Sequence, residues 1–110
     1  MTKNNMKSKP VRFELNNEVF EIDFTMNALC ELEEIYGSID DALVAISKRK
    51  LKDIRTFLWA GLLENRELIT QKEVGKMINM GNLVYVSEII TEAFSDDMPE
   101  AEEGETEGKN

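Results

Sequence analysis

The side chains that could carry out chemistry are few in this chain. It contains no histidine, the residue that most often serves as a general base or binds a metal ion. Its one cysteine, Cys30, therefore has no histidine to activate it and no second thiol with which to form an intrachain disulfide. Because Cys30 lies next to the apolar face of an expected helix, we predict a buried and unreactive thiol.

The many carboxylates do not form a recognisable catalytic pair either. Glu31, Glu33 and Glu34 fall on the polar side of the same expected helix, where a solvated face is the expected arrangement. The glycines are scattered singly and form no phosphate-binding loop, and the acidic residues near the C-terminus lack the spacing of a calcium-binding loop. We therefore expect a protein that is not an enzyme and has no catalytic residue, cofactor or metal site.

The composition is that of a small acidic protein. A chain of 110 residues has the size of one domain, and its formal net charge is −9. This charge argues against nucleic-acid binding and against docking on anionic membranes, because both depend on clustered lysine and arginine. No apolar run is long enough to span a bilayer, and no apolar segment follows the N-terminal lysines. We expect a soluble protein of the cytosol.

The distribution of charge divides the chain into three parts. Residues 1–10 carry lysines and no acid, lack hydrophobic periodicity, and are expected to form a flexible N-terminus. Residues 11–95 should form a single globular domain. Residues 96–110 are rich in acids and almost free of apolar side chains, so we expect a disordered acidic tail. The basic start and the acidic end could also attract one another between copies, which leaves a homo-oligomer open beside plain solubility.

Residues 11–24 (VRFELNNEVFEIDF) have the pattern of a β-hairpin. The two asparagines at 16–17 separate two alternating apolar runs, and asparagine tolerates the positive φ angles of a tight type I′ turn. A loop of two residues here places Phe13 opposite Phe20 and gathers the apolar side chains on one face. An isolated hairpin is only marginally stable in water, so this face should pack on other elements.

The rest of the domain has the spacing and end signals of helices. Residues 26–36 lie between a suitable N-cap, Thr25, and a suitable C-terminal glycine, Gly37. A second helix should begin after Ser38 and end in the basic run at 48–50, because cations are favoured at a helix C-terminus.

The strongest cap signal is at Thr70, since Glu73 follows three residues later as in a capping box. It predicts a helix that Gly81 can terminate, and Asn82 can cap a last helix with apolar residues at helical spacing. Together with the central segment described next, these signals predict an α+β fold that is mostly α-helical, with an N-terminal β-hairpin followed by four to five short helices.

Residues 51–63 (LKDIRTFLWAGLL) form the most apolar run, and we expect the domain to pack around this helix. Four aliphatic side chains fall on one stripe at about 100° per residue: Leu51, Ile54, Leu58 and Leu62. Phe57 lies on one side of the stripe, and Trp59 and Leu63 lie on the other, so the apolar arc is wider than that of an ordinary surface helix. Either neighbouring elements cover all of it, or Phe57, Trp59 and Leu63 contact a partner, since aromatic side chains are typical interface anchors.

The order of these pieces is similar to that of a known family. A hairpin (RFEL–NNEVFEIDF) leads to NALCELEEIYG, SIDDALVAI, LKDIRTFLWAGLL and ITQKEVGKMI, then to a final helix and an acidic tail. Over residues 11–95 this resembles the tail assembly chaperones of long-tailed bacteriophages and prophages, including the related gene-transfer-agent tail proteins. The shared pieces are packing and capping patterns, and none is catalytic. The segment ENREL departs from the family, because it is more charged than the glycine-containing turn found there.

The resemblance implies a non-enzymatic role in tail assembly. Proteins of this kind bind the tape measure protein, a long and largely helical chain with exposed apolar surface, keep it soluble, and help recruit the tail tube protein. They leave before the tail is complete, which implies a place in the cytoplasm of the bacterial host and absence from the mature virion. Two alternatives stay open: a structural tail component retained in the virion, and a small regulator that binds a host protein.

Overall fold

The computed structural model describes residues 10–97, which form a two-stranded antiparallel sheet and five helices. The strands are β1 (Val11–Leu15) and β2 (Glu18–Ile22). The helices are α1 (Met26–Tyr36), α2 (Ile39–Ser47), α3 (Leu51–Leu62), α4 (Gln71–Met77) and α5 (Leu83–Asp97). The fold is therefore α+β and mostly α-helical, with the N-terminal hairpin that the sequence predicts.

The two predicted terminal segments lie almost entirely outside the described residues. Pro10 directly precedes β1, and Asp96 and Asp97 belong to the last turn of α5. The last helix thus continues past the boundary that the sequence predicts at residue 95.

The hairpin forms in the predicted register. Phe13 lies opposite Phe20, and the two rings stack with their centroids 5.7 Å apart. Asn16 and Asn17 have φ angles of 53° and 67°, the left-handed conformation that both central residues of a type I′ turn require. The apolar face of the hairpin is buried in the hydrophobic core, which supplies the support that an isolated hairpin lacks.

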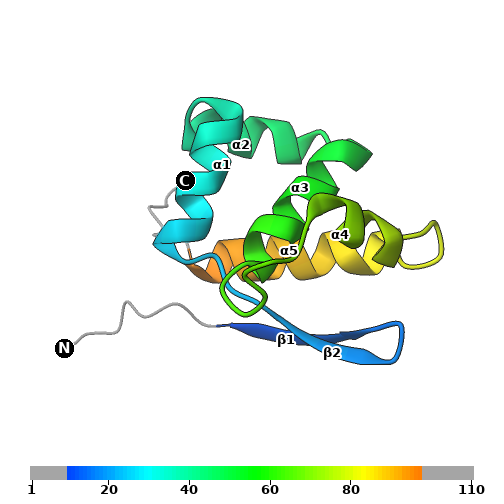
Figure 1. Ribbon diagram of the computed structural model, residues 1–110. Helices are drawn as coiled ribbons and strands as arrows, with labels where there is room; N and C mark the ends of the chain where they lie inside the picture. Colours follow the sequence, from blue (N-terminus) through cyan, green and yellow to red (C-terminus); the bar gives the residue numbers. More distant parts are fainter. Residues whose placement is uncertain (1–9, 98–110) are drawn as a thin grey trace.

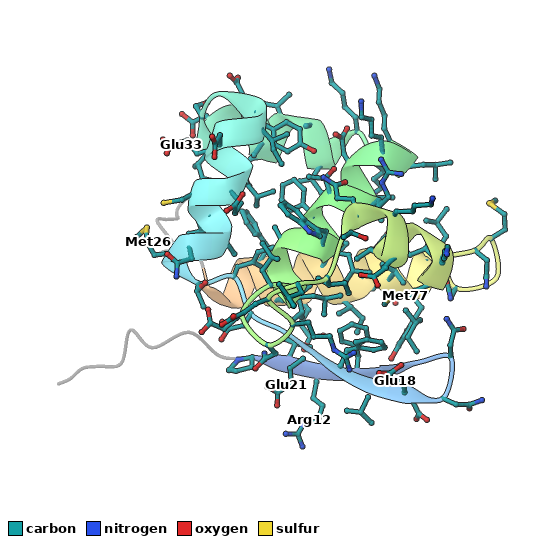
Figure 2. The ribbon with its side chains drawn as sticks, in the orientation of Figure 1. Arg12, Glu18, Glu21, Met26, Glu33 and Met77 are labelled. Carbon is teal, nitrogen blue, oxygen red and sulfur yellow. The ribbon has the colours of Figure 1, made fainter. Side chains whose placement is uncertain are left out.

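The outer face of the hairpin is charged. Arg12 pairs with Glu21 at 2.8 Å, and both side chains point away from the helices (Figure 2).

From the segment between α3 and α4, Arg66 reaches the second strand, where its guanidinium lies 4.3 Å from the centre of the Phe20 ring and 2.9 Å from the Glu18 carboxylate. This arginine fixes the segment to the hairpin.

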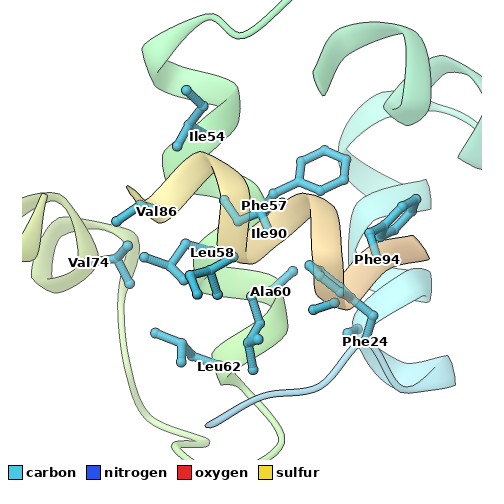
Figure 3. Close-up of a cluster of buried hydrophobic side chains, with 14 of the residues drawn as sticks. Phe24, Ile54, Phe57, Leu58, Ala60, Leu62, Val74, Val86, Ile90 and Phe94 are labelled. Atoms are coloured by element: carbon cyan, nitrogen blue, oxygen red, sulfur yellow. The ribbon is translucent and has the colours of Figure 1, made fainter. Parts of the chain in front are cut away.

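Helix α3 is the centre of the domain, as the sequence predicts. It packs against α1, α2, α4, α5 and β2, with α5 passing behind it and the hairpin beneath (Figure 1). Figure 3 shows Leu58 and Leu62 of α3 in one apolar cluster with Val74 of α4 and Val86 of α5. Leu51, the first residue of the predicted stripe, is the exception, because 62% of its surface is exposed.

Gly61 allows α3 to approach the end of β2 closely. The Asp23 N–H donates a hydrogen bond of 2.8 Å to the Gly61 carbonyl oxygen. A Cβ atom on Gly61 would lie 2.3 Å from Cγ1 of Ile22 and 3.1 Å from Cζ of Phe24. No side chain fits in this space, so the glycine is required by packing.

Most helix ends are capped as the sequence predicts. The Thr25 hydroxyl oxygen accepts a hydrogen bond from the Ala28 N–H at the start of α1, and Gly37, with φ 97°, follows its end. Thr70 and Glu73 form the complete reciprocal capping box at the start of α4. These contacts satisfy backbone groups that a helix end leaves unpaired.

Asn82 directly precedes α5, as the sequence predicts, and its carbonyl oxygen accepts a hydrogen bond of 2.9 Å from the Val86 N–H. The Asn82 side chain accepts a hydrogen bond of 2.9 Å from the Asn79 N–H, and the Asn79 side chain accepts one of 3.0 Å from the Asn82 N–H. Asn82 therefore holds the turn between α4 and α5 with its side chain. Helix α4 ends at Met77, before Gly81 is reached.

Helix α1 buries a narrower face than the sequence predicts. Ala28 and Leu32 are buried, whereas Cys30 and Ile35 are exposed. Helix α1 lies at the margin of the domain, against α2 and α3, so its neighbours cover only a narrow stripe of it. The prediction that Cys30 is buried is wrong.

Candidate functional site

The first of the predicted contact residues, Phe57, is a core residue. Its exposed fraction is 0%, and its ring lies among those of Phe24, Tyr36 and Phe94, with centroid distances of 6.2, 5.9 and 5.5 Å respectively. Phe57 therefore packs in the core, and a contact role for it stays a prediction.

The other two predicted contact residues, Trp59 and Leu63, are half-buried on another side of α3. The Trp59 indole N–H donates a hydrogen bond of 3.0 Å to the Ile69 carbonyl oxygen, which ties the segment after α3 back onto the helix. Leu63 borders a mostly polar hollow beside the start of α1. The three residues do not form one surface, and a contact role for Trp59 and Leu63 stays a prediction.

A more apolar surface lies between α2, α3 and α5, where a groove of about 360 Å³ is open to solvent. We call it the α2–α3–α5 groove. Its lining consists of aliphatic, aromatic and small hydroxyl side chains with one arginine: Leu43, Ile46, Ser47, Arg49, Ile54, Phe57, Ser87, Ile90, Thr91 and Phe94. Phe57 therefore contributes to the floor of this groove, although it has no exposed surface of its own.

An adjoining hollow of about 230 Å³ lies between α3, α4 and α5, and Ile54 lines both spaces. We call it the α3–α4–α5 hollow. Its rim carries Leu51 and Met80, which are 62% and 81% exposed. Val84 is 68% exposed and lies one helical turn before Ser87 of the groove wall. Uncovered apolar surface thus surrounds Ile54 on both sides.

The same region carries a concentration of positive charge in an acidic protein. Five cations lie between residues 48 and 55, with Asp53 as the only acid among them: Lys48, Arg49, Lys50, Lys52 and Arg55. The ion pairs within residues 10–97 use Arg12 and Arg66 instead, so these five cations have no carboxylate partner there. Arg49 lines the groove and Arg55 lines the hollow.

The one acid in this stretch, Asp53, is engaged with α1. It accepts a hydrogen bond of 2.6 Å from the Tyr36 hydroxyl. Burial raises the pKa of Tyr36 above its ordinary value, and the hydrogen bond and the negative charge of Asp53 raise it further. This contact joins α1 to the start of α3 and is structural.

A second and larger groove, of about 760 Å³, lies between the hairpin and the segment that follows α3. Carboxylates make up much of its lining: Glu18, Glu64, Glu67 and Glu73. Leu68, at 91% exposure, stands at this groove as a single exposed aliphatic side chain. We call this space of about 760 Å³ the hairpin groove. Its acidic lining makes it the less apolar of the two surfaces.

Within residues 10–97, no group of histidine, cysteine, aspartate or glutamate side chains is arranged to hold a metal ion. No helix in this part of the chain has the length and apolar character needed to cross a membrane. Comparison with models of known protein families, with curated proteins and with solved structures found no match to this chain.

The sequence did contain a signal for this surface. The cations at 48–50 are favourable charges at a helix C-terminus, and Arg49 among them also lines the groove. In chemical terms, the arrangement around Ile54 provides an uncovered apolar surface with cations beside it. Such a surface suits the binding of another chain.

Proposed function

We propose that this chain is a tail assembly chaperone of a long-tailed bacteriophage or prophage, a non-enzymatic protein that binds and solubilises the tape measure protein and helps recruit tail tube subunits. The observation that carries the proposal is the uncovered apolar surface around Ile54, formed by the α2–α3–α5 groove and the α3–α4–α5 hollow. The resemblance of the sequence to this family supplies the identity of the partner.

The physical requirements of such a chaperone agree with this surface. A long helical client with exposed apolar side chains can place an amphipathic helix in an apolar groove. Weak binding at one groove is sufficient, because many copies along one client act together. A formal net charge of −9 would keep the coated client in solution. The protein would act in the cytoplasm of the bacterial host and leave before the virion is complete.

Co-expression with the tape measure protein of the same phage tests the proposal. The tagged chain should capture the tape measure protein and keep it in the soluble fraction. Leu51→Glu should reduce capture, because Leu51 lines the hollow and is 62% exposed. The substitution should leave folding intact, since an acidic residue is favoured in the first turn of a helix.

Two matched variants locate the surface. Met26→Glu introduces the same charge at a residue of α1 that is 72% exposed, and it should capture the client as well as the wild type does. Leu68→Glu places that charge in the hairpin groove and should also have no effect. Capture lost through Leu68→Glu alone would assign binding to the hairpin groove. Absence of capture by the wild type would refute the proposal.

The alternative roles make different predictions. A structural tail component would be found by mass spectrometry in purified virions, whereas a chaperone should be missing from them. A small regulator would capture a host protein in cells that lack the tape measure protein. A tube gene before this gene and a very long helical gene after it would favour the chaperone.

A further inference from the structure

We propose that the surface around Ile54 selects an acidic amphipathic helix, with Arg49 and Arg55 pairing with carboxylates that flank the apolar face of that helix. The inference rests on the proposed function only for the origin of the helix, which would be a segment of the tape measure protein. The chemical class of the bound helix is argued from this chain alone.

The two arginines lie on different sides of Ile54. Ile54 lines both the α2–α3–α5 groove and the α3–α4–α5 hollow, while Arg49 lines only the groove and Arg55 only the hollow. Each of the two spaces beside Ile54 is therefore lined by one arginine. A helix lying along this surface would present apolar side chains to Ile54 and polar side chains to the two arginines.

Arg55 has a side-chain donor without a partner. Its guanidinium makes no ion pair with any residue between 10 and 97, and its Nε atom is shielded from solvent without an acceptor. Gly75 of α4 leaves room for this side chain, since a Cβ atom there would lie 3.3 Å from Cδ of Arg55. A shielded charged donor without a partner is costly, and a carboxylate placed in the hollow that Arg55 lines would offset part of this cost through a charge-assisted pair with the guanidinium.

Arg49 has an unusual backbone conformation for a residue other than glycine. Its φ angle is 56°, in the left-handed region that glycine adopts most easily. The turn between α2 and α3 would accept glycine at this position with less strain. Arg49 places a positively charged side chain at the groove, whereas a glycine would leave the groove without that charge.

Charge complementarity then decides between possible partners. Arg49 and Arg55 line this surface, and three lysines lie next to them in the sequence at 48, 50 and 52, so an acidic helix gains attraction here and a basic helix is repelled. The acidic residues of segment 98–110 and a second copy of the chain are rival occupants of the same surface. The experiment below separates them from a partner helix.

The test uses two synthetic helical peptides with identical apolar faces, one flanked by glutamates and the other by lysines. Fluorescence anisotropy measures the binding of each labelled peptide to the full chain. We expect the glutamate peptide to bind and the lysine peptide not to bind. Arg55→Gln should weaken binding of the glutamate peptide about tenfold or more. Arg12→Gln, which makes the same change of charge on the hairpin, should leave it unchanged.

Arg49→Gly separates binding from folding. It should weaken binding of the glutamate peptide, while the thermal unfolding midpoint stays the same or rises because backbone strain is removed. Equal binding of both peptides, or equal effects of Arg55→Gln and Arg12→Gln, would overturn the inference. So would the absence of binding by either peptide.

The rival occupants give distinct results. Replacing Glu102, Glu103 and Glu105 by glutamine should leave peptide affinity unchanged, and a large gain would assign the surface to the chain's own C-terminal segment. The chain alone should sediment as a monomer, and a dimer that the glutamate peptide dissociates would assign the surface to a second copy. Either result would overturn the inference.

The proposed function fails separately, through absence of tape measure capture in cells. Peptide selectivity without such capture would preserve this inference while refuting the chaperone role.

Discussion

Replacement of Gly61 by alanine should destabilise the domain strongly for so small a change. The new Cβ atom would lie 2.3 Å from Cγ1 of Ile22, whereas an ordinary contact is at least 3.4 Å, so the helix and the strand would have to separate by about 1 Å. Ile22 and Phe24, which meet this atom, are both fully buried and cannot move into solvent. The hydrogen bond from the Asp23 N–H to the Gly61 carbonyl oxygen would be stretched at the same time.

The magnitude follows from two opposing effects. Overpacking of a core usually costs about 1–3 kcal/mol, and alanine in place of glycine in a helix returns about 0.5–1 kcal/mol. Because the contact is far inside the normal distance, we expect a net loss of about 2 kcal/mol in the free energy of unfolding. For a domain of this size that corresponds to a fall of roughly 8–16 °C in the unfolding midpoint.

The assay is thermal and urea unfolding followed by circular dichroism, with Gly75→Ala as the matched control. Gly75 is exposed on α4, and its added Cβ atom would meet only the flexible side chain of Arg55, at 3.3 Å from Cδ. We expect this variant to lose no stability. Equal midpoints for Gly61→Ala, Gly75→Ala and the wild type would refute the packing described between α3 and β2.

Three further predictions concern local contacts. Thr70→Ala removes the capping box of α4 and should cost about 1 kcal/mol in urea unfolding; an unchanged midpoint would show that the cap contributes nothing. Since the pKa of Tyr36 is raised in the folded protein, the unfolded chain loses this proton first as the pH rises, so stability should fall from about pH 10 upward. Tyr36→Phe should show a smaller fall over the same range, and identical pH profiles would contradict this. The Cys30 thiol is exposed and should react with Ellman's reagent in the native protein at nearly the rate seen in urea; a strongly protected thiol would contradict the exposure.

Local patterns in the sequence were sufficient to predict the hairpin and most helix ends. The two asparagines at 16–17 determine the turn, and the turn determines which residues lie opposite one another. Thr70 and Glu73 interact across three residues, so their spacing alone predicts the cap. In these cases the interacting groups are close in the chain, and no knowledge of the tertiary structure is needed.

Burial was less predictable because it depends on which elements cover a face. Cys30 and Phe57 were both beside apolar stripes, yet one is exposed on a marginal helix and the other is enclosed by three aromatic rings. Asn82 lies directly before α5 as predicted, but its side chain accepts a hydrogen bond from the Asn79 N–H of the preceding turn. Spacing along one helix does not contain this information.

The candidate surface was the least predictable feature. It exists because α2, α3, α4 and α5 leave Ile54 bordered by open space on two sides, which is a property of four helices together. The apolar spacing of α5 places Val86, Ile90 and Phe94 in the core, whereas α2 buries only Ala42 and leaves Leu43 exposed. Their spacing could not show that a groove would remain between them.

Hydrogen–deuterium exchange of the chain, alone and in complex with a tape measure segment, tests the central claim most directly. We expect slower exchange in α2, in the first turns of α3, in the turn between α4 and α5 and in α5, with no change in the hairpin. Protection confined to the hairpin and the segment after α3, or no protection anywhere, would contradict the claim that the surface around Ile54 binds this partner.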